Sequence, residues 1–523
     1  MIDTVCPNYL SELPTDYASR LAQQYNKTIS KTHKKTQGQF FTPVKLARLM
    51  ASMVDVNAKH LRILDPGCGV GILSCALIEF LLLQRSIETI DLIVYETDVD
   101  IIFNTEACLN YLKDWALLKH TKLDFSIHTQ DFIVDNNFSF QNFDQSYFHH
   151  NNLFDIVISN PPYFKLKGND KRVLIAENIL GKQPNIYSIF LSVAATLLKT
   201  GGELIFVIPR SFTSGYYYTA FRDYFLKKLQ LEKMHIFSSR RYPFQVDNVL
   251  QETVIMKASR SEYIEHTHPV EICSSVGLTD IENSIKKTTQ INKIIKFDSN
   301  QKIIHLPTNE QEESIIAVFD SWDQTLKNYN IRVSTGPVVD FRSLEFLTKR
   351  KSSLSVPLFW LNNVFKMNLI WPLSQKENIK RRSQYISCNK FSKSRLIKTQ
   401  NCILLRRFSS KDDLSRLIAT PIFKSDFNQY GYIGIENHLN YIYKENEEFT
   451  INELLGISAL LNSLIFDIYF RTFNGNTNVS STELRNIPMP PYHKIIEIGL
   501  RLMECNDITQ SIIDTVVNEI LIS

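Results

Sequence analysis

The chain of 523 residues is longer than one hydrophobic core usually supports, so two or three domains are expected. Its composition, 44% hydrophobic and 21% charged residues with a net charge of +4, is that of a soluble globular protein. No apolar run reaches the roughly 18 residues that cross a bilayer, and the N-terminus lacks the layout of a secretory signal. These features indicate a cytoplasmic protein without a membrane span. The eight cysteines are scattered with no CxxC pair, so we expect neither a metal site nor a disulfide framework.

The charge is unevenly distributed along the chain. Residues 341–411 contain sixteen Lys and Arg but only two acidic residues, a net charge of +14, so the remainder carries −10. Such a segment repels itself unless a polyanion neutralises it, which indicates a nucleic-acid-binding face. A solvated surface with compensating acids nearby in space is the alternative.

Short apolar strands alternate with helical stretches between residues 61 and 258, after a polar segment, residues 1–35, that we expect to be a helical or flexible arm. Near-continuous Val, Ile and Leu strands in this alternation predict a parallel α/β sheet covered on both faces. The alternation ends near residue 260, so we predict one domain over 36–260 and an irregular α+β domain, ending in helices, over 261–523. The predicted strands are LRILD, DLIVYE, FDIVIS, GGELIFVIP and NVLQETVIM, and the helical segments include ILSCALIEFLLL and NIYSIFLSVAATLL.

A glycine-rich turn, PGCGVG, joins the first predicted strand to a helix. Its glycines permit positive φ and let a ligand approach the helix N-terminus. Asp65 before the glycines suits a cationic amino group better than a pyrophosphate, and Glu96 at the end of the next strand could accept from both ribose hydroxyls. A nucleoside with an ammonium group describes S-adenosylmethionine. A tight turn with a capping Asp is the alternative.

A third loop, TQDF, contains Asp131 and Phe132. Asp131 could accept from the adenine amino group of the cofactor, and Phe132 could cover the adenine ring. An N-cap Asp followed by a core Phe is the other interpretation.

The sequence SNPPYF follows the buried strand FDIVIS, at the edge where open α/β sheets bind ligands. Its two prolines fix φ and remove two backbone donors, which leaves a rigid loop with unpaired carbonyls. The side-chain oxygen of Asn160 and the carbonyl of Pro161 could accept both hydrogens of an exocyclic amino group. The nitrogen then pyramidalises and its lone pair turns toward an electrophile, with no prior deprotonation.

In this order the motifs resemble those of amino-group DNA methyltransferases, and the segment TQGQFFTP, residues 36–43, resembles their additional N-terminal cofactor motif. With the recognition domain last, the chain is similar to γ-class adenine-N6 enzymes of Type II restriction-modification systems, over nearly its whole length. The resemblance implies a class I, Rossmann-like, S-adenosylmethionine-dependent methyltransferase sheet followed by an α+β target-recognition domain.

The resemblance also implies the activity. The enzyme would transfer a methyl group from S-adenosylmethionine to N6 of an adenine flipped out of a specific site in double-stranded DNA. It would thereby protect a prokaryotic host from a cognate restriction endonuclease, as a monomer that requires no metal. Cytosine-C5 enzymes need a Pro-Cys dipeptide, which this chain lacks, and cytosine-N4 enzymes more often carry Ser in place of Asn160, so adenine is favoured.

The expected site residues fall into three groups. In the catalytic group, Tyr163 and an aromatic residue of YPFQVD, for which we choose Phe244 over Tyr242, would stack on the flipped base. The catalytic residues are Asn160, Pro161, Pro162, Tyr163 and Phe244; the cofactor-binding residues are Thr36, Phe41, Thr42, Pro43, Asp65, Gly67, Gly69, Gly71, Glu96, Asp131 and Phe132; and the DNA-binding residues are Lys349, Arg350, Lys351, Arg381, Arg382, Arg406 and Arg407.

Three other functions are compatible with parts of this pattern. A glutamine-N5 protein methyltransferase also uses an Asn-Pro-Pro-Tyr loop, but such enzymes typically lack a long basic C-terminal half and the segment at residues 36–43. A fused restriction enzyme would need more than thirty-five residues before that segment to hold a nuclease. A non-catalytic DNA-binding specificity protein is disfavoured because the residues from Asn160 to Tyr163 and the glycine loop are intact.

Overall fold

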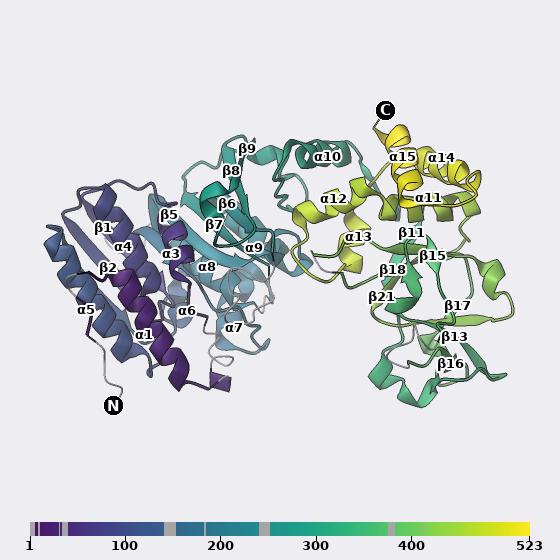
Figure 1. Ribbon diagram of the computed structural model, residues 1–523, viewed down its shortest axis with the longest axis horizontal. Helices are drawn as coiled ribbons and strands as arrows, with labels where there is room; N and C mark the ends of the chain where they lie inside the picture. Colours follow the sequence, from purple (N-terminus) through teal and green to yellow (C-terminus); the bar gives the residue numbers. More distant parts are fainter. Residues whose placement is uncertain are drawn as a thin grey trace. The chain divides into compact units, whose positions relative to one another are not determined.

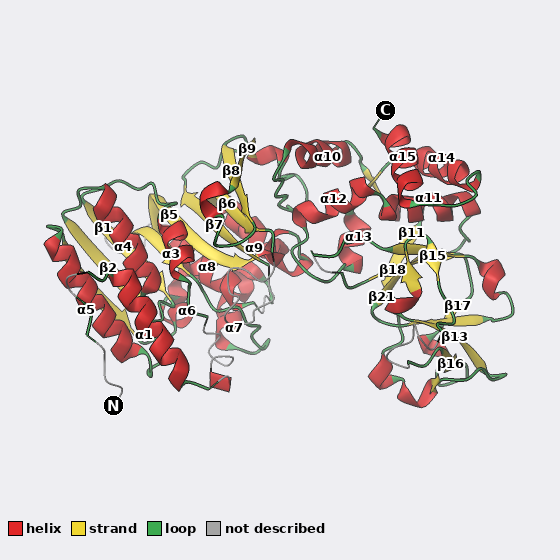
Figure 2. Cartoon of the chain, in the orientation of Figure 1, coloured by secondary structure: helices red, strands yellow, loops and turns green. Residues whose placement is uncertain are grey.

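The computed structural model describes residues 6–8, 11–30, 32–33, 40–140, 153–182, 185–239, 252–374, 382–409 and 412–522 (Figures 1 and 2). The chain forms two compact units, Met1–Thr308 and Asn309–Ser523.

The first unit is built on a nine-stranded sheet in the order β3-β2-β1-β4-β5-β7-β6-β8-β9. Strands β3, β2, β1, β4 and β5 run parallel, and β7 is antiparallel to both β5 and β6. This is the predicted Rossmann-like α/β sheet, parallel in its first five strands. The strands are β1 (His60–Pro66), β2 (Thr89–Tyr95), β3 (Lys122–His128), β4 (Phe154–Ser159), β5 (Leu198–Pro209), β6 (Leu229–Phe237), β7 (Thr253–Arg260), β8 (Pro269–Ser275) and β9 (Ile285–Gln290).

Alternate side chains of the strands enter two separate cores, one on each face of the sheet. In β4, Ile156 and Ile158 pack on the face covered by α1, α3, α4 and α5, whereas Val157 packs on the face covered by α6 to α9. Burial on both faces explains why these strands read as continuous apolar runs. The helices are α1 (Pro14–Thr28), α3 (Val44–Ala51), α4 (Ile72–Gln84), α5 (Ile102–Leu118), α6 (Phe132–Asp135), α7 (Lys171–Leu180), α8 (Ile186–Thr196) and α9 (Thr219–Lys228).

The predicted N-terminal arm is instead largely part of the first unit. Residues 14–28 form α1, and its side chains Tyr17, Leu21 and Tyr25 are almost completely buried in the core beside α4 and α5. The apolar spacing of four residues places them on one helical face. The polar character of the other face hid this pattern in the sequence.

The boundary between the two units lies later than predicted, after Thr308 rather than after residue 260. Strand β8 pairs with β6, and β9 pairs with β8, so both extend the first sheet. Strand β9, IKKTTQ, alternates exposed and buried residues, and this edge-strand pattern differs from the continuous apolar runs of the central strands. Strand β7 matches the end of the predicted NVLQETVIM strand, whose residues 248–251 lie outside the described residues.

The second unit is α+β, as predicted, with a four-stranded sheet, β11-β21-β18-β19, and a five-stranded sheet, β12-β16-β13-β20-β17 (Figure 2). The last two elements of the chain are the helices α14 and α15. The helices are α10 (Glu310–Asp320), α11 (Ile451–Asn462), α12 (Leu464–Phe473), α13 (Ser481–Asn486), α14 (Tyr492–Met503) and α15 (Gln510–Leu521). The strands are β10 (Gln324–Thr325), β11 (Ile331–Thr335), β12 (Leu347–Thr348), β13 (Ser355–Phe359), β14 (Val364–Phe365), β15 (Asn368–Leu369), β16 (Tyr385–Ser387), β17 (Ile397–Lys398), β18 (Cys402–Arg406), β19 (Ala419–Ile422), β20 (Tyr432–Ile435), β21 (Leu439–Lys444) and β22 (Pro488–Met489).

Within the described part of the chain, no single helix has the length and apolar character needed to span a membrane. Helices α11 and α12 meet those criteria only when taken together, and they are bent by 53° relative to each other.

Candidate active site

A pocket lies at the carboxyl edge of the parallel strands in the first unit. Its wall includes residues from the loops after β1, β2, β3 and β4, together with residues 40–42. Parallel strands bring their carboxyl ends to one edge, so four motifs that are far apart in the sequence meet here. The structure therefore brings the predicted cofactor and catalytic loops together.

The glycine loop after β1 has the predicted backbone conformation. Gly67, Gly69 and Gly71 have φ values of +75°, +56° and +89°, in the left-handed region that favours glycine. A Cβ on Gly69 would lie 3.3 Å from the ring of Phe41. Gly67 and Gly69 line the pocket, and Gly71 immediately precedes α4.

Asp65 at the end of β1 is fully buried and does not line the pocket. Its Oδ2 accepts a hydrogen bond of 2.7 Å from Ser74 Oγ on α4. Its Oδ1 is buried without a hydrogen-bond partner among the described residues. Burial raises the pKa of this carboxyl group to about 7. A buried acceptor left open beside the glycine loop is compatible with a cationic or protonated partner.

Glu96 connects the loop after β2 to the glycine loop. Its Oε2 accepts from the Gly69 amide at 2.9 Å, and its Oε1 accepts from the Asp98 amide at 2.9 Å. Burial raises the pKa of Glu96. Each carboxylate oxygen has a second lone pair, so Glu96 can still accept from a ligand in the pocket.

Asp131 is an N-cap residue that also lines the pocket. Its Oδ1 accepts from the amides of Ile133 and Val134, at 3.0 and 3.1 Å, so it is the N-cap of α6. Its Oδ2 lies 3.4 Å from Nη1 of Arg172, and both side chains line the pocket. Phe132 is 2% exposed and belongs to the core, while one part of its ring also lines the pocket.

The side-chain amide of Asn160 has a defined orientation in the pocket. Its Nδ2 donates to the Phe40 carbonyl and to Thr42 Oγ1, both at 3.1 Å. Two acceptors on one side of the amide identify that side as nitrogen. The opposite atom, Oδ1, is therefore the acceptor, as the predicted chemistry requires.

Tyr163 and Pro161 are not part of the pocket wall; Pro161 is buried, and Tyr163 is half-buried like Asn160. The Tyr163 hydroxyl lies 2.5 Å from Asn160 Oδ1 and 2.7 Å from the Val207 carbonyl, and the ring makes an edge contact with Tyr187. The hydroxyl occupies one of the two lone pairs of Asn160 Oδ1 and leaves the other. Within the described residues, no hydrogen bond reaches the Pro161 carbonyl.

The segment before α3 supplies the remaining predicted cofactor residues that the structure describes. Phe41 and Thr42 line the pocket, and Pro43 is the N-cap residue of α3. Thr36 and Phe244 lie outside the described residues.

Comparison with known proteins gives a consistent result. Residues 74–244 match the model of the Eco57I restriction-modification methylase family. The chain is 29% identical over 497 residues to the Type II methyltransferase M.PstI of Providencia stuartii, which covers 95% of both chains. It is 31% identical over 494 residues to the Type II methyltransferase M.BsuBI of Bacillus subtilis, which covers 94% of this chain and 95% of that one. The chain belongs to the Type II methyltransferases of restriction-modification systems.

Two solved structures share the fold of this methyltransferase at low sequence identity. The cryoEM structure of the DrdV–DNA complex has a TM-score of 0.51 and 12% identity, and covers 94% of this chain and 59% of that one. A nuclease-deletion mutant of the Type ISP restriction-modification enzyme LlaGI, in complex with a DNA substrate mimic, has a TM-score of 0.51 and 13% identity. The match covers 93% of this chain and 48% of that one. The likeness extends over both units.

Several residues of the methyltransferase pocket were not predicted from the sequence. Phe40, Tyr95, Arg172 and Phe190 line it alongside the predicted residues. Tyr95 could have been found because it precedes Glu96 at the end of a strand. Phe190 lies on the apolar helix α8 and looks like an ordinary core residue, and Arg172 has no local sequence signal.

The basic segment of the second unit presents its predicted DNA-binding residues in different ways. Lys349, Arg350 and Lys351 are exposed, and none of them forms an ion pair with a described carboxylate. Arg382 is half-buried, with its guanidinium group 4.8 Å from the centroid of the Trp360 ring.

Arg406 and Arg407 are half-buried and bound to backbone carbonyl groups. Arg406 Nε donates to Val364 at 2.7 Å, and Arg407 Nη1 donates to Asn437 at 3.0 Å. These bonds give both arginines a structural role in the second unit. Arg381 lies outside the described residues.

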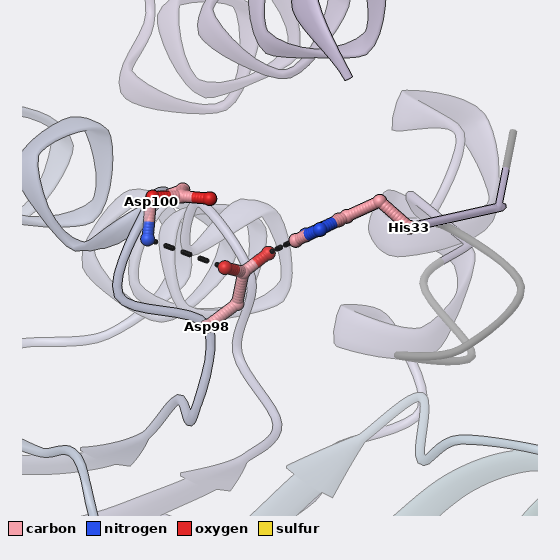
Figure 3. A group of neighbouring side chains, drawn as sticks. All are labelled: His33, Asp98 and Asp100. Atoms are coloured by element: carbon pink, nitrogen blue, oxygen red, sulfur yellow. Dashed lines mark hydrogen bonds and ion pairs between the residues drawn. The ribbon is translucent and has the colours of Figure 1, made fainter. Parts of the chain in front are cut away.

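A small polar group lies next to the Glu96 loop (Figure 3). Buried Asp98 accepts at Oδ2 from Tyr25, at 2.6 Å, and is paired with Nε2 of His33 at 2.8 Å. The hydrogen bond to Asp98 raises the pKa of His33. Ligand atoms of His33, Asp98 and Asp100 lie within 4.8 Å of one another. The hydrogen bonds account for this cluster as a link between the N-terminal residues and the loop after β2.

Proposed function

We propose that this Type II methyltransferase transfers a methyl group from S-adenosylmethionine to N6 of an adenine flipped out of a specific site in double-stranded DNA. It works as a monomer without a metal ion in a prokaryotic cytoplasm, and it protects DNA from a cognate restriction endonuclease. The observation that carries the proposal is the position of Asn160, whose acceptor oxygen borders the same pocket as the glycine loop and Glu96.

The chemistry of the pocket fits S-adenosylmethionine. Glu96 lines the pocket and offers lone pairs for ribose hydroxyl groups. Asp65 does not line the pocket, but it lies beside the glycine loop with a buried carboxyl oxygen that has no partner among the described residues, and this oxygen suits an ammonium group. Phe132 and the other apolar wall residues suit an adenine ring, and the Asp131 carboxylate suits its amino group. When bound, the cofactor supplies a methyl group activated on a sulfonium.

Asn160 supplies the first acceptor for the target amino group. The lone pair of an exocyclic amino nitrogen is delocalised into the ring, so the nitrogen is a poor nucleophile. Accepting its hydrogens at fixed positions favours the pyramidal form. Because Phe40 and Thr42 hold the amide of Asn160, its Oδ1 needs little reorganisation as positive charge develops on the nitrogen.

The Pro161 carbonyl supplies the second acceptor. The two prolines limit the backbone to one conformation, and no described donor competes for this carbonyl. Two fixed acceptors also orient the nitrogen for in-line displacement, so positioning supplies much of the rate acceleration. No general base is required.

Tyr163 provides an aromatic ring for the flipped base, and Phe244, which lies outside the described residues, is the predicted second ring. Flipping costs a few kcal/mol, and stacking on an aromatic ring returns about 1 to 3 kcal/mol per base. The Tyr163 hydroxyl is held by Asn160 and Val207, which fixes the ring beside the acceptor.

The second unit positions the DNA. Its exposed cations Lys349, Arg350 and Lys351, which form no ion pair with a described carboxylate, suit phosphate groups, and the half-buried Arg382 suits a phosphate or a base edge. Membership of the Type II methyltransferases favours DNA over a glutamine side chain as the methyl acceptor. The intact Asn160 site favours a catalytic protein over a specificity protein.

The proposal is tested by incubating the protein with S-adenosylmethionine labelled on the methyl group and mixed-sequence duplex DNA. We expect the label in N6-methyladenine after the DNA is digested to nucleosides. Label on cytosine would overturn the choice of base, and label on protein, or none, would overturn the proposed function. Modified-base sequencing of DNA from cells that express the protein would then identify the target site.

A further inference from the structure

An exposed basic strip follows the catalytic loop of the first unit. Lys165 and Lys167 come two and four residues after Tyr163. Lys165 forms an isolated bridge with Asn185, so the backbone is extended here, and Leu166 between the two lysines is buried. Because successive side chains of extended backbone point to opposite sides, both lysines face the solvent on the side opposite Leu166.

The charge of this strip has no internal compensation. Asp170 is the only acidic residue between Asn160 and Ala176. It already binds the guanidinium group of Arg172, with hydrogen bonds of 2.9 and 2.7 Å. Among the described residues, neither Lys165 nor Lys167 takes part in an ion pair.

An exposed aromatic ring adjoins the strip. The ammonium group of Lys165 lies 6.0 Å from the centroid of the Tyr217 ring, and Tyr217 is 74% exposed. A cation held over a ring keeps its charge, and the contact limits the freedom of a flexible side chain. Tyr217 belongs to the segment after β5, the strand next to β4 in the sheet, so both residues lie at the carboxyl edge.

We propose that Lys165 and Lys167, with Tyr217 beside them, form a DNA-binding surface on the catalytic unit that neutralises phosphates next to the target nucleotide. This surface rests on the proposed function, because the catalytic loop that precedes it would hold the flipped adenine. It is separate from the basic segment at residues 341–411. Phosphate contacts at this position hold the duplex while one nucleotide leaves the stack.

The chain offers a matched control at the opposite edge of the sheet. Lys119 is exposed, forms no ion pair within the described residues, and lies 5.5 Å from the centroid of the Trp115 ring. It directly follows α5 and precedes β3, so it lies at the amino edge of the parallel strands. Lys119 and Lys165 are therefore both exposed lysines beside an aromatic ring, and they differ in their position relative to the catalytic loop.

The experiment measures binding of a fluorescent mixed-sequence duplex between about 50 and 200 mM salt. For Lys165→Ala we expect the slope of log K against log salt to become shallower by about 0.9, with about eightfold weaker binding near 0.1 M salt. In the double variant Lys165→Ala, Lys167→Ala the slope should become shallower by about twice as much as in Lys165→Ala. The double variant Lys165→Arg, Lys167→Arg should retain the wild-type slope, and Lys119→Ala should have the wild-type slope and affinity. Thermal unfolding and cofactor binding verify that each variant is folded.

Two results would overturn the surface: a wild-type slope in the double alanine variant, or an equal loss in Lys119→Ala. Methyl transfer measured on the same proteins separates this surface from the proposed function. Adenine methylation by the wild type, with an unchanged slope in the double variant, refutes the surface alone. Lysine-dependent binding without methylation refutes the function alone. A wild-type protein that does not bind the duplex refutes both.

Discussion

The pocket of the first unit and the basic segment of the second unit hold their polar groups in opposite ways. In the pocket, Glu96 is held by two amides and Asn160 by two acceptors. In the basic segment, Lys349, Arg350 and Lys351 are exposed and have no ion-pair partner among the described residues. Chemistry on one nitrogen requires fixed dipoles, whereas attraction to phosphates tolerates mobile charges. Losing a pocket contact should therefore affect rate, and losing a surface cation should affect salt-dependent binding.

The largest expected effect comes from removing the held acceptor. Asn160→Ala should lower the single-turnover rate of methyl transfer about a thousandfold or more, because an acceptor fixed for the developing charge is lost. Cofactor affinity, measured by calorimetry, should change little. Retained turnover would show that Asn160 Oδ1 is not the acceptor. Fixed polar groups in the pocket would then not be required for the rate, and the contrast with the basic segment would not hold.

Removing exposed cations of the basic segment should give the next largest effect. The triple variant Lys349→Ala, Arg350→Ala, Lys351→Ala should weaken duplex binding about five-hundredfold near 0.1 M salt and make the salt dependence shallower by about 2.7 units. The rate at saturating DNA should be nearly unchanged. Lys424→Ala is the control, since Lys424 is already paired with Glu448 at 2.6 Å. A rate effect without a change in salt dependence would contradict phosphate neutralisation.

Asp65 should make stability depend on pH. Burial raises its folded-state pKa from 3.8 to about 7, so the folded state binds more protons than the unfolded state between these values. The free energy of unfolding therefore falls as pH rises through this window, by at most about 1.4 kcal/mol per pH unit. Asp65→Asn cannot ionise. In urea titrations without cofactor, the variant should gain stability relative to the wild type from pH 5 to pH 8. An equal difference at both pH values would contradict this prediction.

The smallest effect should come from one hydroxyl that orients Asn160. Thr42→Val removes the acceptor at 3.1 Å from Asn160 Nδ2 and should slow transfer about tenfold at saturating cofactor, whereas Thr42→Ser should retain most of the rate. In an Asn160→Ser background there is no Nδ2, so Thr42→Val should add little further loss. Additive losses in this double-mutant cycle would mean that Thr42 acts only through the cofactor.

Much of the first unit could be predicted from the sequence because its central strands are buried on both faces and its loops carry motifs. Glu96 and Asn160, which follow strand ends, line the pocket, whereas Asp65 is fully buried and does not line it. The role of Asp131 was open because an N-cap and a ligand acceptor use the same residue type. Asn160 donates hydrogen bonds to Phe40 and Thr42. These two partners could not be found from the sequence, since a hydrogen bond across about 120 residues leaves no local pattern.

The second unit was predicted only in its class and charge. Its many short strands give weak periodicity, and a count of basic residues does not separate exposed Lys349 from Arg406, which is bound to the Val364 carbonyl. The length of the catalytic unit was underestimated for a related reason. Strands β8 and β9 are paired at the sheet edge, and edge strands lack the continuous apolar signal of central ones.

Strands β8 and β9 determine where this enzyme can be recombined with a relative. A chimera joined after residue 260 would leave β6 without β8 and expose a row of unpaired backbone groups. A junction after Thr308 keeps the nine-stranded sheet complete. Exchange of the second unit at that junction would therefore leave intact the sheet that carries the pocket.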